Sequence, residues 1–207
     1  MPMQFFKEVF QLTFIFLILL MPVSTLAYLI GAIGSCPAED GIKVAKKACL
    51  VAGGMGIFFA LTGSKLFLSL GIGLPTFKIF AGILLFVNGF SLLKLKGNQH
   101  VAPTELKNKK IHTDIAITPL AFPLLTGPAT IGQLIAYYEE MKTPLEHFTL
   151  CLAIVLALII SFCLFYVCLK HLNLLSTRLL GVAERLTGLF AITLATQCTI
   201  NGINGIL

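Results

Sequence analysis

Residues 115–138 read IAITPLAFPLLTGPATIGQLIAYY, and this stretch decides the fold of the chain. It contains no Lys, Arg, Asp or Glu, and a helix needs about 20 apolar residues to cross a bilayer. Three prolines, Pro119, Pro123 and Pro128, fall within ten positions. Because proline lacks a backbone N–H and clashes with the carbonyl one turn back, a continuous helix cannot form here. The stretch therefore predicts a membrane span that is broken near its middle.

Three further windows are also free of charged residues: 9–38, 147–169 and 186–207. The whole chain of 207 residues is 57% hydrophobic and 12% charged, with a mean hydropathy of +0.94. An average soluble domain is about 25% charged, so this chain has too little polar surface for a globule in water. The composition excludes a secreted globule, a nucleic-acid-binding protein and a disordered protein. The expected partner of the chain is therefore the lipid bilayer.

The expected fold is all-α, a polytopic membrane protein with six transmembrane helices. For the first span, a signal peptide cleaved near Ser24–Ala27 is the alternative, but the apolar run is too long for one. The spans form two three-helix halves, residues 1–95 and 115–207, joined by a basic loop at 96–114. The six expected spans cover residues 9–33, 48–70, 77–95, 115–138, 147–169 and 180–206.

The basic residues predict the orientation of the chain. With six spans, both termini share one side of the membrane, and that side carries four of the 15 Lys and Arg residues against eleven on the other. Because basic loops stay in the cytoplasm, loops 34–47, 96–114 and 170–179 are expected to be cytoplasmic. Both termini are then periplasmic, and the membrane is expected to be a bacterial inner membrane.

Spans one and four share an unusual pattern. Pro22 is followed three residues later by Thr25, and Pro123 by Thr126, at an offset of 101 positions. An odd number of spans in each half makes the second half insert upside down. The chain therefore reads as two inverted repeats with broken helices in spans one and four. Matched breaks of this kind indicate a transporter site at the repeat interface.

A helix that begins inside the membrane presents free N–H groups and a positive dipole end, which suits a carboxylate. We expect Thr126, Gly127 and Thr130 to meet such a group with their N–H groups and hydroxyls. The alternative for each break is an ordinary proline kink whose freed backbone groups form hydrogen bonds with neighbouring helices. The alternative for the amide side chains in the middle of the spans is that they hold neighbouring helices together by hydrogen bonds. The further candidates for the pocket are Ser24, Thr25, Asn88, Gln133 and Gln197, and the helix breaks are expected at Pro22, Pro119, Pro123 and Pro128.

No Asp or Glu lies in the middle of a span, so a buried carboxylate relay has no obvious carrier. Lys78 and Arg185, at an offset of 107, lie near span ends and are expected to be snorkelling anchors. No metal-ligand spacing and no enzyme motif occurs, so neither a metal, a cofactor nor an enzymatic activity is expected. An intramembrane thiol carrier is disfavoured because span four contains no Cys.

Residues 119–131, PLAFPLLTGPATI, resemble the P-L-A-x-P-x-x-x-G-P-x-T-I signature of the MarC family of inner-membrane proteins. Residues 71–79 resemble its G-I-x-x-P-x-[LF]-[RK]-I turn, and residues 185–188 fit its last span. The resemblance covers essentially the whole chain. It implies six spans in two inverted halves, as in LysE-type exporters, and some members look like transporters of small neutral amino acids.

The sequence departs from the family pattern in span one. Members commonly have P-L-A-N-P there, whereas Met21 stands here in place of the Asn. If that amide holds a solute or an ion, the site in the first half is altered. The expected function is a secondary transporter or exporter of a small neutral solute such as an amino acid, which works by rocking one half against the other. The alternative is a non-transporting membrane protein with a structural or regulatory role.

Overall fold

A computed structural model describes residues 2–33, 37–94, 116–171 and 177–206, and all regular elements in these ranges are helical. Five stretches are long and apolar enough to cross a membrane, with the first two helices counted as one stretch. A further pair of helices is bent by 57° and makes a sixth span if the pair is counted as one. The helices are α1 Pro2–Leu20, α2 Pro22–Ile33, α3 Ala38–Ser69, α4 Leu74–Lys94, η2 Ala116–Leu125, α6 Pro128–Glu140, α7 Pro144–Lys170 and α8 Thr177–Asn204.

Both spans predicted to be broken are broken. The first is interrupted at Met21, between α1 and α2, where φ is +45°. In η2, Thr118 and Phe122 have extended backbone angles inside the helical stretch. Each directly precedes a proline, whose ring disfavours helical angles in the residue before it. The prolines thus set the places where the backbone leaves the helix.

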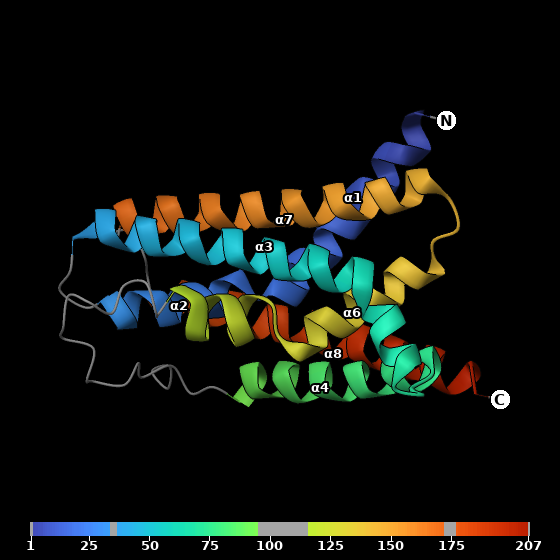
Figure 1. The fold of residues 1–207 in the computed structure, drawn as a ribbon. Helices are drawn as coiled ribbons and strands as arrows, with labels where there is room; N and C mark the ends of the chain where they lie inside the picture. The colour runs from blue at the N-terminus through green and yellow to red at the C-terminus, as the bar shows by residue number, and fades with distance from the viewer. Residues whose placement is uncertain (1, 34–36, 95–115, 172–176, 207) are drawn as a thin grey trace.

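The helices run lengthwise, and the chain begins and ends at the same end of the bundle (Figure 1). In that view α3 and α7 lie along one long edge, and α4 and α8 lie along the opposite edge (Figure 1). The main helix packings are α4 on α8, α1 and α3 on α7, α4 on α6, and α3 on both η2 and α6. Each of them joins a helix of residues 1–95 to one of residues 115–207, so the two halves interlock and do not form separate bodies.

The α4–α8 pair is held close by glycines. A Cβ added at Gly82 would lie 2.9 Å from the carbonyl oxygen of Ala195, and one added at Gly89 would lie 2.9 Å from that of Gly188. These two contacts also show that α4 and α8 run antiparallel. Small residues allow two helices to approach closely. In a bilayer the lipid is as apolar as the side chains, so helices associate through such close packing and not through the hydrophobic effect.

The predicted loop at 34–47 is wrong over most of its length, because α3 begins at Ala38. Glu39 and Asp40 lie in the first turn, where acidic side chains favour the helix N-terminus. Lys43 pairs with Asp40 one turn on, at 3.1 Å. The charged residues at the start of α3 mark the part of the helix that lies outside the apolar zone. They do not mark the end of the helix. Of the other predicted loops, 96–114 lies outside the described residues, as do 172–176 of the loop at 170–179; α7 ends at Lys170 and α8 begins at Thr177.

The first span contributes to the core. Phe16, Leu26 and Leu29 are at most 1% exposed and pack in one cluster with residues of α3, α4, η2 and α7. A cleavage near Ala27 would remove Phe16 and Leu26 from the core. The packing therefore supports the interpretation of residues 9–33 as a span over the signal-peptide alternative.

Candidate functional site

The break in span four lies at Thr126 and Gly127. Gly127 is the N-cap of α6 with extended backbone angles, and Pro128 occupies the first helical position, where its missing N–H costs nothing. The Thr126 N–H donates to the carbonyl of Ala121 at 2.9 Å. Its hydroxyl donates to the carbonyl of Ala52 in α3 at 3.2 Å. With Thr126 only 1% exposed, this threonine fastens the break to the first half of the chain.

The breaks of spans one and four are joined by a hydrogen bond. The Thr130 hydroxyl donates to the carbonyl of Leu19 at 3.1 Å, and Thr130 is 4% exposed. Leu19 belongs to the last turn of α1, whose carbonyls have no partner within their own helix. Thr130 therefore satisfies a group that the first break sets free. The hydroxyls of Thr126 and Thr130 are both used in this way, and a carboxylate at this position stays a prediction.

The candidates from the first half lie in different surroundings. The Thr25 hydroxyl donates to the carbonyl of Met21 at 3.2 Å and helps to close the break in its own span. Ser24 is buried, and its hydroxyl has no hydrogen-bond partner within the described structure. Asn88 is exposed on the outer surface of α4. The fold thus brings Thr25 to the breaks and leaves Asn88 away from them.

The position of Met21 has a conformational requirement. Its φ of +45° lies in the left-handed region, where Asn is several-fold enriched among residues other than glycine. An Asn, as in the family pattern that span one resembles, would fit this conformation better than Met does. The replacement of Asn by Met at position 21 therefore affects the backbone conformation at the break.

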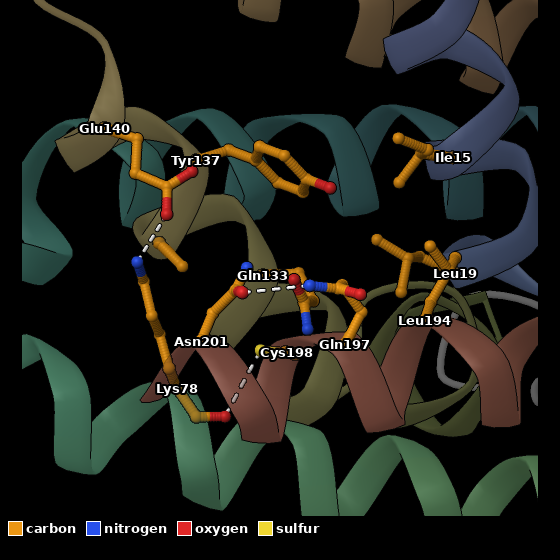
Figure 2. A pocket seen from close by; sticks show the side chains of 11 residues that line it. Ile15, Leu19, Lys78, Gln133, Tyr137, Glu140, Leu194, Gln197, Cys198 and Asn201 are labelled. Carbon is orange, nitrogen blue, oxygen red and sulfur yellow. Dashed lines mark hydrogen bonds and ion pairs between the residues drawn. The ribbon is translucent and has the colours of Figure 1, made fainter. Parts of the chain in front are cut away.

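A small polar cavity lies beside the breaks, between α1, α4, α6 and α8 (Figure 2). It encloses about 60 Å³. At roughly 10–15 Å³ for one water-sized occupant, it has room for a solute of a few non-hydrogen atoms. Leu19, whose carbonyl accepts the bond from Thr130, is part of its wall. The polar residues that line it are Lys78, Gln133, Tyr137, Glu140, Gln197 and Asn201.

An ion pair between Lys78 of α4 and Glu140, the last residue of α6, crosses the cavity wall. The Lys78 side chain is 13% exposed and that of Glu140 is 50% exposed. The Cys198 thiol of α8 donates to the Lys78 carbonyl at 3.2 Å. Lys78 lies about one turn into α4, so the pair sits at the end of the bundle where the chain begins and ends (Figure 1).

Three amide side chains also belong to the polar lining. Gln197 donates to Asn201 one turn further along α8 at 2.9 Å. Gln133 is 6% exposed; its Nε2 makes no hydrogen bond to an oxygen or nitrogen atom of the described residues and interacts with the Cys198 thiol. Its side chain points into the cavity beside Cys198 (Figure 2). A thiol is a weak acceptor, so this buried donor is not fully satisfied by the protein.

Sequence reasoning named Gln133 and Gln197, and both line this cavity. It treated Lys78 as an anchor at a span end, whereas Lys78 is mostly buried and paired with Glu140. It missed Tyr137 and Glu140 because both lie at the end of their span, where polar side chains normally face water. The spacing of 133, 137 and 140 places all three on one face of α6, and this pattern was readable once the helix was located.

Four polar contacts between distant residues cross between the two halves. They are the bonds of Thr126 to Ala52 and of Thr130 to Leu19, the Lys78–Glu140 ion pair, and the bond of Cys198 to Lys78. Many other side-chain hydrogen bonds join positions one helical turn apart, such as Thr25 to Met21. The described part of the chain holds no group of three or more His, Cys, Asp or Glu arranged to bind a metal ion.

These features define a class: a multi-pass α-helical membrane protein in which two broken helices meet beside a polar cavity. The model of the MarC family of integral membrane proteins matches residues 6–207, and the chain belongs to this family. It is 28% identical to a UPF0056 membrane protein of Aquifex aeolicus, across 99% of this chain and 97% of the relative. A UPF0056 membrane protein of Methanocaldococcus jannaschii is 29% identical across the full length of both chains. No solved structure matches the chain.

Proposed function

We propose that this protein is a secondary transporter of a small neutral solute such as an amino acid, and that the cavity beside the two breaks is its solute site. The observation that carries the proposal is the buried Gln133 amide, whose Nε2 has no oxygen or nitrogen partner in the described residues, in a polar cavity that reaches the broken end of α1. Polar groups inside a membrane protein are expensive and mark solute paths. Ligand sites of this kind lie beside discontinuous helices at the interface of inverted repeats.

Alternating access requires one part of the bundle to move against another. The two halves of the chain interlock through their main packings, so a rigid rocking of residues 1–95 against 115–207 would disrupt most of the core. Helices α4 and α8 pack more extensively against each other than against any other helix, and they lie along one edge of the bundle (Figure 1). We infer that this pair is the moving unit, because the cavity lies between it and the helices α1 and α6.

The orientation belongs to the same proposal. Both termini lie at the end of the bundle that holds Lys78 and Glu140 (Figure 1). The unequal distribution of basic residues makes that end the periplasmic side of an inner membrane. In this arrangement the cavity faces the periplasmic end. Labelling of cysteines introduced at each end of the bundle with an impermeant reagent in intact cells tests the assignment.

The proposal is tested with purified protein in liposomes. Uptake and counterflow of a panel of labelled amino acids and other small neutral solutes are measured, together with solute-dependent thermal stabilisation, which follows from binding to the folded state. Gln133→Met removes the amide donor and keeps the length of the side chain, so it should weaken binding of the transported solute. Gln4→Met is the matched control, because Gln4 is an exposed amide near the start of α1. Wild-type protein that neither binds nor moves any solute of the panel would refute the proposal and favour a structural or regulatory role.

A further inference from the structure

We propose that the Lys78–Glu140 ion pair determines which solutes the cavity accepts, by exchanging its own partners for the two charges of a zwitterion. The solute carboxylate pairs with Lys78, and the solute ammonium pairs with Glu140. This inference rests on the proposed transport function and adds the residues and the rule by which the solute is selected. No covalent bond changes, and the net charge of the site stays zero throughout.

The first support is the charge content of the cavity. Among the residues that line it, Lys78 and Glu140 are the pair of opposite charge, and every other lining side chain is neutral. They come from facing helices, α4 and α6, and the Lys78 side chain is only 13% exposed. A charge in such a place is stable only while it is paired, since removing one partner leaves the other desolvated and uncompensated.

This requirement works as a filter. A solute with a single charge can replace one member of the pair and leaves the other unpaired. A neutral solute without charges cannot replace either member. A zwitterion satisfies both at once, so selection arises from the penalty on the wrong solutes as much as from attraction of the right one.

The second support is the Gln133 amide. It is buried, its Nε2 has no oxygen or nitrogen partner within the described residues, and it lies on the same face of α6 as Glu140, about two turns away. Its N–H₂ group can donate to the solute carboxylate held by Lys78. The site then holds a cation and a neutral donor for the carboxylate and an anion for the ammonium.

The ion pair also links the two halves of the chain, α4 in the first and α6 in the second. Entry of a zwitterion between Lys78 and Glu140 would replace this direct link by one through the solute. The same event that binds the solute would therefore loosen the contact that holds α4 against α6. A ligand shifts a conformational equilibrium only through a difference in its contacts between two states, and the exchange supplies that difference.

The test compares four forms of one transported amino acid on the purified full-length protein: the zwitterion, the amino acid amide as a cation, the N-acetyl amino acid as an anion, and the N-acetyl amide as a neutral form. Binding is read as a rise in melting temperature and by calorimetry. Wild type should bind the zwitterion at least about tenfold more tightly than the other three, because the cation leaves the buried Lys78 unpaired, the anion leaves Glu140 unpaired, and the neutral form replaces neither member of the pair.

The variants should change this preference reciprocally. Lys78→Met should favour the amide, which supplies a cation for Glu140, and Glu140→Gln should favour the N-acetyl acid, which supplies an anion for Lys78. The double variant carries no unpaired charge and should favour the neutral form, which keeps the test open if a single variant does not fold. Lys43→Met removes one member of the exposed Asp40–Lys43 pair on α3 and should keep the wild-type preference.

The outcomes separate the two proposals. If wild type binds none of the four forms of any amino acid, the transport proposal fails. If wild type binds the zwitterion and the variants keep the same order of preference, the transport proposal stands and the role of the ion pair is refuted. A uniform loss of melting temperature without a change of preference would show that the pair only fastens α4 to α6.

Discussion

The hydrogen bond between the two breaks makes a sharp prediction about stability. Thr130→Val keeps the shape of the side chain and removes the hydroxyl that donates to the Leu19 carbonyl at 3.1 Å. That carbonyl lies at the interrupted end of α1 and has no partner in its own helix. Leaving a buried acceptor unsatisfied costs about 1–3 kcal/mol. We therefore expect Thr130→Val to lower the free energy of unfolding by about 2 kcal/mol.

Thr126→Val is the informative comparison. The Thr126 hydroxyl donates at 3.2 Å to the carbonyl of Ala52, which lies in the interior of α3. A carbonyl there already accepts a bond from the residue four positions on, so the loss of the second bond leaves it satisfied. Interhelical hydrogen bonds of this kind in membranes average about 0.6 kcal/mol. The two valine variants should therefore differ although both threonines are buried and both bonds cross between the halves.

Thermal unfolding of the detergent-purified variants measures the difference. With about 2–4 °C for each kcal/mol in a chain of this size, Thr130→Val should lower the melting temperature by about 4–8 °C and Thr126→Val by about 1–2 °C. Thr193→Val is the control, because the exposed Thr193 hydroxyl bonds only within its own helix, to Leu189; it should change little. A loss for Thr126→Val equal to or larger than that for Thr130→Val would refute the assignment of Thr130 as the cap of the broken end.

Thermal unfolding also tests three further substitutions. Met21→Asn should raise the melting temperature, because a left-handed residue costs about 1–2 kcal/mol and Asn tolerates it better; a fall would show that the packing of Met21 outweighs its backbone strain. Gly89→Ala should cost about 1–3 kcal/mol by pressing on the Gly188 carbonyl, whereas Gly54→Ala, with nothing within 4 Å, should be neutral or stabilising. Thr143→Ala removes the capping box of α7 and should cost about 1 kcal/mol, most visibly as fraying of its first turn in hydrogen exchange.

Much of the fold was predictable because its causes are local. The charge-free windows and the prolines at 119, 123 and 128 predicted a bent span, and the structure bends η2 against α6 by 57°. The Pro22 break was predicted by the same rule and lies at Met21. The second span was predicted to begin at 48 and α3 begins at Ala38, because a hydropathy window detects the apolar zone, whereas the helix extends beyond it.

The candidate site was less predictable. Gln133 and Gln197 were named because amides are unusual inside a span, and both line the cavity. Thr126 and Thr130 were expected to meet a solute, yet their hydroxyls bond backbone carbonyls of the first half. Asn88 has the same amide chemistry as Gln133 but faces outward from α4. Residue type and depth do not fix which face of a helix turns toward a cavity.

The sequence by itself determined that the chain is a helical membrane protein, where its backbone must break, and to which family it belongs. Hydropathy and the missing N–H of proline are properties of each residue, and they act through lipid that offers no hydrogen bonds. Only the tertiary structure decided that the two breaks are joined through Thr130 and Leu19, and that Lys78 and Glu140, 62 positions apart, form a pair. Such partners are chosen by the interlocked packing of the two halves, which no local pattern encodes.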